Sequence, residues 1–334
     1  MNMSGPNHYS FIRYLEAKRS IDDRALNQTV WQRMAELLRK LQETKRVTIL
    51  EVGCGIGTMI ERMLERGLLT KGAYKAVDSN PEYVAEAKAR LCRYADRRGF
   101  EAREEAGGTL VLERPGYEIV INLAVSDLFD LAGRDRNDSG YDLILAHAFL
   151  DLVDLDAALC KIFSLIRPGG LLYFSLNFDG TTIFEPRIHP ALDRQIEELY
   201  HQTMDLRQTG RGPSRMSGTG RRLLVYLTRA GATVMSAGSS DWVIHPHSEG
   251  YSPDESYFLH FIIDTIRGAL TGIPDLDQSS LHEWIAERHR QVEKGVLVYI
   301  AHQIDVLAEV PEKRNADDIP GRYHPGRSRG PENP

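Results

Sequence analysis

An apolar run that ends in an acidic residue and three alternating glycines constrains this chain most. Val47–Val52 is followed by Gly53, Gly55 and Gly57, then by a helical pattern, and a second short apolar run ends at Asp78. This order predicts a buried strand, a tight turn, a crossover helix and a second parallel strand. Glycines let backbone amides approach a ligand, and a carboxylate after the second strand suits a ribose diol. The sequence therefore predicts a site for a nucleoside-containing cofactor.

The spacing of the three glycines narrows the choice of cofactor. Dinucleotide-binding folds use G-x-G-x-x-G, whereas here the glycines alternate and an acid stands two residues before the first of them. The pattern E-x-G-x-G-x-G resembles motif I of the class I S-adenosylmethionine (SAM) dependent methyltransferases, and the resemblance extends over residues 47–178. It implies that the methionine end of SAM is held by Glu51, Gly53, Gly55 and Gly57. A plain turn between a strand and a helix is the alternative.

Three further residues match this family on the strands that follow. The resemblance implies that Asp78 binds the ribose of SAM, that Asp127 receives the adenine amino group, and that Leu128 packs on the adenine ring. A carboxylate accepts two hydroxyl hydrogen bonds, which fits a diol at Asp78. The alternatives are an acid at a helix N-terminus for Asp78 and a solvated loop acid for Asp127.

Two residues outside these motifs are candidates for the same site, one for catalysis and one for cofactor binding. His147 follows the predicted strand 141–146, at the edge where open α/β sheets bind ligands, and there it could take a proton from the attacking atom. A buried histidine satisfied by the backbone is the alternative. Arg13 shares a helix face with Tyr9. In many family members an arginine or tyrosine on a leading helix reaches the SAM carboxylate; an exposed polar helix face is the alternative.

Strands and helices alternate along most of the chain, which predicts an α/β fold with right-handed crossovers. The resemblance implies a seven-stranded, mostly parallel sheet with helices on both faces and an antiparallel last strand. Aromatic-rich helical patterns predict a helical insertion between strands six and seven, and Pro115-Gly116 predicts a hairpin before strand three. The predicted strands are 47–52, 74–77, a strand from Tyr117 that ends at Ser126-Asp127, 141–146, 171–177, 232–244 and 296–310.

This interpretation divides the chain into three parts. Residues 1–46 form an N-terminal helical cap, 47–310 the methyltransferase domain with its insertion at about 250–294, and 311–334 a mobile tail rich in proline, glycine and charge. The arginine- and glycine-rich run 207–222 is either a clamp for a phosphate or carboxylate on the substrate or a solvated connector.

Composition disfavours several other classes of protein. The net charge of −6 over 334 residues argues against a general nucleic-acid coat, because neutralising phosphates needs a basic face. Three cysteines are scattered singly, as in a reduced cytoplasmic protein. We expect no membrane helix, no signal peptide and a cytoplasmic location. The histidines lack companions at zinc-type spacing, so we expect no metal site.

These observations lead to one functional hypothesis and two alternatives. We expect a SAM-dependent methyltransferase that acts on oxygen or nitrogen of a small molecule, as a monomer or homodimer, with SAM as its cofactor and neither a membrane nor a nucleic acid as its partner. Methyl transfer is a direct displacement, so the protein must mainly align the reacting atoms and exclude water. The alternatives are an RNA or protein methyltransferase and a SAM-binding protein without catalytic activity.

Overall fold

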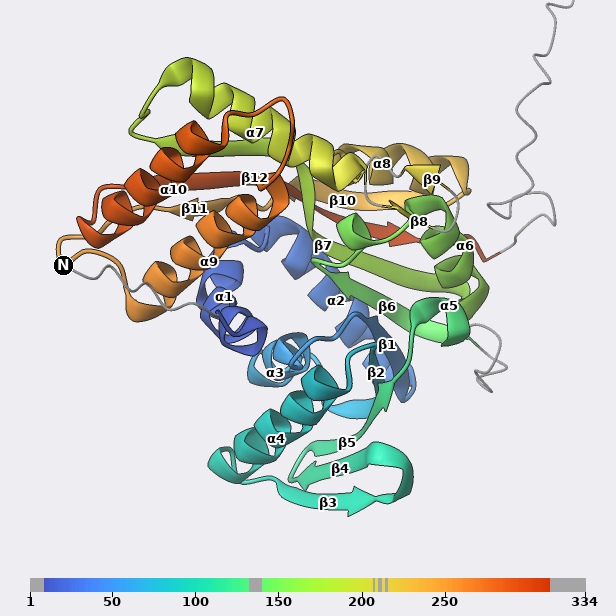
Figure 1. The fold of residues 1–334 in the computed structure, drawn as a ribbon. Coiled ribbons are helices and arrows are strands. Elements are labelled where there is room, and N and C mark those ends of the chain that lie inside the picture. Colours follow the sequence, from blue (N-terminus) through green and yellow to red (C-terminus); the bar gives the residue numbers. More distant parts are fainter. Residues whose placement is uncertain (1–8, 132–139, 207, 210–211, 214–215, 313–334) are drawn as a thin grey trace, which may run out of the picture.

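A sheet of ten strands forms the centre of the molecule (Figure 1). The structure is a computed structural model that describes residues 9–131, 140–206, 208–209, 212–213 and 216–312. The strand order is β10-β12-β7-β6-β1-β2-β5-β4-β3, with β11 paired to β12. The strands are β1 (Val47–Val52), β2 (Lys71–Asp78), β3 (Glu101–Glu105), β4 (Thr109–Arg114), β5 (Tyr117–Val125), β6 (Tyr141–His147), β7 (Ile166–Glu185), β10 (Thr233–Ser239), β11 (Trp242–Ile244) and β12 (Val298–Glu309).

The middle of the sheet is parallel and both of its sides are antiparallel. Strand β1 pairs in parallel with β2 and β6, β2 with β5, and β6 with β7. The long strand β12 runs antiparallel to β7 and β10. The predicted seven-stranded sheet with an antiparallel last strand is therefore confirmed in β1, β2, β5, β6, β7, β10 and β12. Three strands are added to it, because the hairpin contributes β4, the predicted strand 232–244 divides into β10 and β11, and β3 was not predicted.

Helices cover both faces of the sheet, as the sequence predicted. Successive side chains of a strand point to opposite faces of the sheet, so Ile49 packs with one hydrophobic cluster and Leu50 with the other. The first cluster takes side chains from α1 (Phe11–Ala25), α2 (Gln28–Thr44), α3 (Thr58–Glu65), α4 (Pro81–Arg97), α7 (Pro190–Asp205), α9 (Pro253–Leu270) and α10 (Gln278–Glu293). The second takes them from α5 (Leu128–Leu131), α6 (Leu155–Leu165) and α8 (Thr219–Arg229).

The helical insertion lies where the sequence placed it. Helices α9 and α10 stand between β11 and β12 in the chain, and Ser252 begins α9 with a capping box that it shares with Glu255. Helix α1 packs against α9 (Figure 1), with the rings of Tyr14 and Phe261 stacked at 4.0 Å between centroids. The first helix and the insertion therefore meet over the same part of the sheet.

The structure describes only parts of the predicted tail and of the arginine-rich run. Residues 313–334, most of the predicted tail, lie outside the described residues, as do Arg207, Arg211 and Arg215 of the arginine-rich run. In the rest of that run, β8 (Gln208–Thr209) pairs with β9 (Gly212–Pro213), and Arg221 pairs with Asp179. The division into cap, domain and tail stays a prediction. No helix among the described residues is both long and apolar enough to cross a membrane.

Candidate functional site

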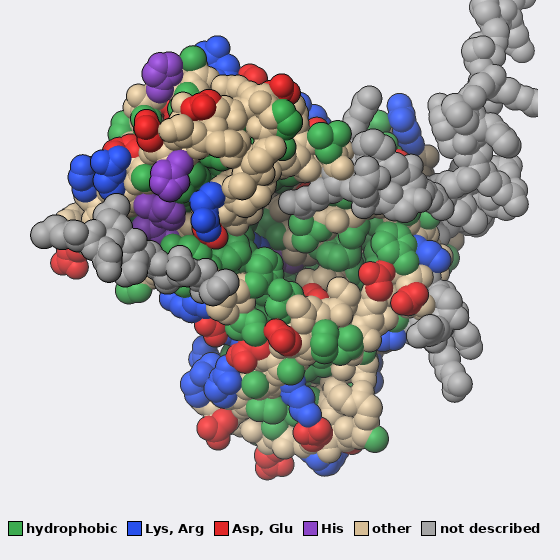
Figure 2. Space-filling view, in the orientation of Figure 1, with side chains coloured by type: hydrophobic (Ala, Val, Ile, Leu, Met, Phe, Trp, Pro, Cys, Tyr) green, Lys and Arg blue, Asp and Glu red, His purple; other side chains and the backbone are tan. Residues whose placement is uncertain are grey.

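A cavity of about 620 Å³ opens at the carboxyl ends of the central strands. Figure 2 shows the surface hollowed there, with hydrophobic side chains around the hollow. The lining residues form two groups. The glycine-loop end is formed by Glu51, Gly53, Gly55, Asp78, Asp127 and Leu128. The aromatic chamber is formed by Tyr14, Phe178, Tyr200, Trp242, Phe261 and Tyr299. The volume lies in the range of small-molecule sites.

The glycine loop and Asp78 hold each other in place. The carboxylate of Asp78 accepts hydrogen bonds from the backbone N–H groups of Gly55 and Asn80, both at 2.9 Å. Gly53 has a backbone φ of +67°, and a Cβ there would overlap the ring of Phe149, so only glycine suits this position. Gly57 also has a positive φ but faces Ala87 of α4 and does not line the cavity. The predicted turn therefore joins β1 to β2 through the Asp78 side chain.

Glu51 is a buried carboxyl group at the wall of the cavity. Its side chain accepts a hydrogen bond from the Tyr74 hydroxyl at 2.8 Å, and no ion pair joins it to another described residue. Burial raises the pKa of Glu51 to about 8, although the Tyr74 hydrogen bond and the charge of Arg62 act in the opposite direction. A ligand that brings a positive charge to this wall would favour the ionised carboxylate.

Asp127 and Leu128 stand together at the end of β5, where α5 begins. The Asp127 carboxylate accepts a hydrogen bond from the backbone N–H of Phe129 at 2.8 Å. The side chain of Leu128 is buried, and both residues line the cavity. The structure thus brings these two residues to the same cavity as Glu51 and Asp78, because the carboxyl ends of neighbouring parallel strands meet at one edge of a sheet.

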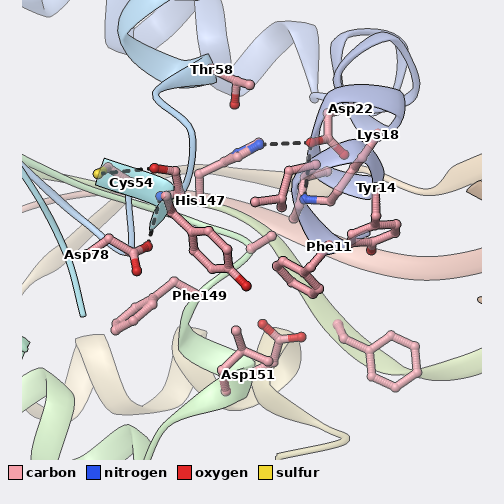
Figure 3. Close-up of a pocket in the computed structure, with 18 of the residues that line it drawn as sticks. Phe11, Tyr14, Lys18, Asp22, Cys54, Thr58, Asp78, His147, Phe149 and Asp151 are labelled. Atoms are coloured by element: carbon pink, nitrogen blue, oxygen red, sulfur yellow. Dashed lines mark hydrogen bonds and ion pairs between the residues drawn. The ribbon is translucent and has the colours of Figure 1, made fainter. Parts of the chain in front are cut away.

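His147 belongs to a buried polar network that reaches α1 (Figure 3). Its Nδ1 lies 2.8 Å from the hydroxyl of Ser175, and its Nε2 lies 3.2 Å from both Oδ2 of Asp22 and a guanidinium nitrogen of Arg62. A proton on Nε2 satisfies two of these contacts, because Nε2 donates to Asp22 while Nδ1 accepts from Ser175. Burial and the charge of Arg62 lower the pKa of His147 to about 4, against the hydrogen bond with Asp22.

Asp22 is the centre of this network. It accepts a hydrogen bond from the indole N–H of Trp242 at 2.9 Å and pairs with Lys18 at 3.1 Å. Burial alone would raise the pKa of Asp22, but Lys18, His147 and Arg62 outweigh it and lower the pKa to about 2. The carboxylate is therefore charged at neutral pH and holds α1 to β6 and β11.

Comparison with known proteins identifies the part of the chain that carries the glycine loop. Residues 50–172 match the family model described as a methyltransferase domain. Residues 50–172 of the chain therefore form a methyltransferase domain.

Individual relatives of this methyltransferase domain are distant. An arsenite methyltransferase from Aquipseudomonas alcaligenes is 30% identical over 128 residues, which are 38% of this chain and 32% of the relative. A malonyl-(acyl-carrier protein) O-methyltransferase from Bacillus cytotoxicus is 26% identical over 166 residues, 49% of this chain and 46% of the relative. The matched part of the chain thus spans less than half the length of either relative. The X-ray structure of YjhP from E. coli is similar to 90% of this chain, and the match includes 99% of the YjhP chain. The sequence identity is 13% and the TM-score is 0.42.

Arg13 lies apart from the other predicted residues of the methyltransferase site. It is not among the residues that line the cavity. Its guanidinium pairs with Asp254 at 2.6 Å and lies 5.0 Å from the centre of the Tyr257 ring. Two other residues of the same helix, Tyr14 and Lys18, line the cavity instead. Helical spacing fixes which residues share a face, but the partner that α9 offers decides where Arg13 points.

Sequence reasoning missed three polar residues of the site, namely Lys18 as a lining residue, Asp22 and Gln303. All three are buried and line the cavity. The signal for Asp22 was present, because this acid interrupts the apolar face of the first helix and an acid at a buried helical position needs a partner. For Gln303 the signal was its place inside a long apolar strand. Neither signal identifies which residues of other elements lie near these side chains in the fold.

Two non-glycine residues with left-handed backbone also line the cavity. Ala148, directly after β6, has a φ of 49°, and Leu176 within β7 has a φ of 55°. Such a conformation costs roughly 1–2 kcal/mol per residue for an L-amino acid. The backbone N–H of Ala148 donates to the carbonyl of Ser175, so this part of the cavity wall is held by the same residue that contacts His147. Backbone strain therefore concentrates at the site, as it does at many functional sites.

Proposed function

We propose that the chain transfers a methyl group from SAM to an oxygen or nitrogen atom of a small-molecule acceptor. The observation that carries this proposal is that a single cavity joins the glycine-loop end to the aromatic chamber. The two ends differ in chemistry, because the first offers backbone amides and carboxylates and the second mainly rings. One end suits the nucleoside cofactor and the other suits an acceptor beside it.

The residues of the glycine-loop end fit SAM in charge and in shape. Glu51 is a buried carboxyl group without an ion-pair partner among the described residues, and the amino group of SAM would supply the missing cation. Asp78 would bind the ribose hydroxyls, while Asp127 and Leu128 would hold the adenine. Gly53, Gly55 and Gly57 shape the loop that approaches the methionine part. Arg13, paired with Asp254, would have to leave that partner to reach the SAM carboxylate.

The protein's contribution to the reaction is alignment and exclusion of water. When bound, SAM supplies a methyl group on a sulfonium; the carbon–sulfur bond breaks, a bond from carbon to oxygen or nitrogen forms, and the acceptor loses a proton. The aromatic chamber keeps water from the acceptor. His147 is the proposed proton acceptor, since its low pKa keeps the imidazole neutral. Because both ring nitrogens have partners, His147 must exchange Ser175 or Asp22 for the acceptor.

The relatives do not fix the acceptor of this chain. One carries arsenite in its name and another malonyl-(acyl-carrier protein), so the acceptor has to be argued from the residues of the chamber. We propose that the acceptor is a small molecule rather than RNA or protein, because side chains of α1 and α9 form part of the cavity wall and narrow the site. A cavity of this volume has room for a drug-sized ligand.

Calorimetry with S-adenosylhomocysteine tests the cofactor site. We expect Asp78→Ala to weaken binding at least tenfold, since two hydroxyl hydrogen bonds to a charged group are lost. Asp130→Ala is the matched control, because Asp130 is an exposed acid nearby that does not line the cavity. Equal affinities of the two variants would contradict the ribose contact.

Labelled methyl transfer tests the acceptor class. The protein is incubated with a metabolite extract, RNA and total protein, each with methyl-deuterated SAM. We expect mass spectrometry to find one labelled methyl group on a single small compound. Label that appears only on RNA or protein would replace the small-molecule proposal with one of the alternatives, and binding without any transfer would indicate a non-catalytic SAM-binding protein.

A further inference from the structure

Gln303 has a buried side-chain oxygen without a partner at the wall of the aromatic chamber. Tyr299, Ala301 and Gln303 occupy alternate positions of β12, so they share one face of the strand, and all three line the cavity. Gln303 is 2% exposed. Its Oε1 has no hydrogen-bond partner among the residues that the structure describes. An unsatisfied buried acceptor costs free energy, which a ligand with a suitable donor would recover.

A second buried glutamine shows how this chain treats such a side chain elsewhere. Gln291 on α10 is 5% exposed and does not line the cavity. Its Oε1 accepts from Arg288 at 2.7 Å, and its Nε2 donates to the carbonyl of Pro186 at 3.4 Å. This structural amide is satisfied at both ends, whereas the buried amide of Asn177 on β7, which does not line the cavity, also has a side-chain oxygen without a partner among the described residues. Gln303 differs from Asn177 because its free oxygen belongs to a residue of the cavity wall, where a ligand can reach it.

The walls around Gln303 are rings supplied by six different elements. Tyr14 comes from α1, Phe178 from β7, Tyr200 from α7, Trp242 from β11, Phe261 from α9 and Tyr299 from β12. Two of these rings, Tyr14 and Phe261, stack on each other with 4.0 Å between their centroids. A chamber with this many aromatic faces is complementary to a flat ring that stacks or meets them edge to face.

The charges of the chamber favour an uncharged acceptor. Among the described residues of the lining, Lys18 is the one with a cationic side chain, and it is already paired with Asp22 at 3.1 Å. A further carboxylate, Asp151, lies on the other side of the cavity beside Phe149 (Figure 3). An anionic acceptor would find no uncommitted cation among the described lining residues and would be repelled by the carboxylates of Asp22 and Asp151. A cationic acceptor would be repelled by the sulfonium of SAM.

On the assumption that the proposed function is right, we propose that the aromatic chamber binds an uncharged aromatic acceptor. The side-chain oxygen of Gln303 accepts a hydrogen bond from a hydroxyl or N–H group of that molecule. Gln303 is thereby a specificity-determining residue of the acceptor site, distinct from the residues that hold the cofactor.

The test measures binding of three probes by calorimetry to the full chain saturated with S-adenosylhomocysteine. The probes are 2-naphthol, 6-hydroxy-2-naphthoate and decahydro-2-naphthol, which differ in one property at a time. We expect 2-naphthol to bind at least tenfold more tightly than the naphthoate and more tightly than the saturated alcohol.

Gln303→Leu should weaken 2-naphthol binding roughly fivefold, and Gln303→Met repeats the test if the leucine variant does not fold. Gln202→Leu, at an exposed position of α7, is the matched control.

Each contrary outcome removes a defined part of the proposal. Failure of S-adenosylhomocysteine to bind the unmodified chain would overturn the proposed function itself. If S-adenosylhomocysteine binds but the naphthoate binds as tightly as 2-naphthol, or no probe binds, the acceptor class is wrong. Equal binding of the saturated alcohol would refute the aromatic requirement. Unchanged 2-naphthol affinity in both Gln303 variants would remove the role of Gln303 while leaving the cofactor site intact.

Discussion

The carboxylate of Asp22 lies 3.2 Å from Nε2 of His147, which joins the first helix to the end of a central strand. The same carboxylate pairs with Lys18 and accepts a hydrogen bond from Trp242. Because all four residues are at the cavity, this contact ties the N-terminal helix to the site.

Replacing Asp22 by asparagine should destabilise the protein strongly. The amide would leave the buried charge of Lys18 without its carboxylate and would leave Arg62 with Asp23 alone. Breaking a buried pair in this way costs about 3 kcal/mol or more. Asp254→Asn is the control, because the pair of Asp254 with Arg13 is only half-buried and should contribute under about 1 kcal/mol. Urea unfolding measures both. Similar midpoints for the two variants would mean that the buried network adds no stability.

Protonation of His147 should make the protein less stable in mild acid. Its pKa of about 4 in the folded chain lies below the ordinary value of about 6.5. Between these values the unfolded chain binds the proton and the folded chain does not, so the free energy of unfolding falls as the pH drops from 6.5 to 4, by up to about 3 kcal/mol. His147→Gln should flatten this slope, whereas His245→Gln, at an exposed position, should not. Parallel pH profiles for the two variants would contradict the burial of a neutral imidazole.

Binding of SAM should release a proton from Glu51. The pKa of this group is about 8 in the free protein, so at pH 7 it is mostly protonated, and an ammonium group beside it favours the ionised form. Affinity should therefore rise with pH and level off above pH 8. Calorimetry of S-adenosylhomocysteine in phosphate and Tris buffers counts the released protons.

A ligand and a variant provide the controls for Glu51. 5′-Methylthioadenosine lacks the amino acid part, so it should bind without releasing a proton. Glu51→Gln should abolish the release seen with S-adenosylhomocysteine and weaken its binding. Proton release that persists in Glu51→Gln would assign the titration to another group.

The contact between Gly53 and Phe149 predicts a non-additive pair of substitutions. Gly53→Ala places a methyl group against the Phe149 ring at a positive φ, and it should lower stability by roughly 2 kcal/mol or more. In a Phe149→Ala background the steric part disappears and only the backbone strain remains. The double-mutant cycle in urea should therefore give a coupling above about 0.5 kcal/mol. Additive effects would show that the ring does not restrict position 53.

The parts of the site that the sequence predicted are those fixed by strand order. Glu51, Asp78 and Asp127 each end or follow a strand of a parallel sheet, and strand order alone brings them to one edge. Asp22 and Gln303 come from the first helix and the last strand, 281 positions apart in number. Their meeting at one cavity depends on how α1 and the insertion pack, which no local pattern encodes.

Strand β3 shows a different limit of sequence reasoning. Its five residues, Glu101 to Glu105, are all exposed, so they lack the alternation of apolar and polar residues by which a half-buried strand is detected. It pairs with β4 on one side only. The hairpin, by contrast, was predicted correctly because Pro115-Gly116 lies between two apolar runs, and Arg114 faces Tyr117 across the turn.

The composition of β3 has a consequence for the behaviour of the protein at high concentration. Strand edges with free backbone groups recruit other chains into aggregates. Here the edge carries Glu101, Arg103, Glu104 and Glu105, so a second copy that docked in the same way would place carboxylates against carboxylates and strip water from them. The edge that lengthens this sheet therefore also protects the protein against fibril-like self-assembly.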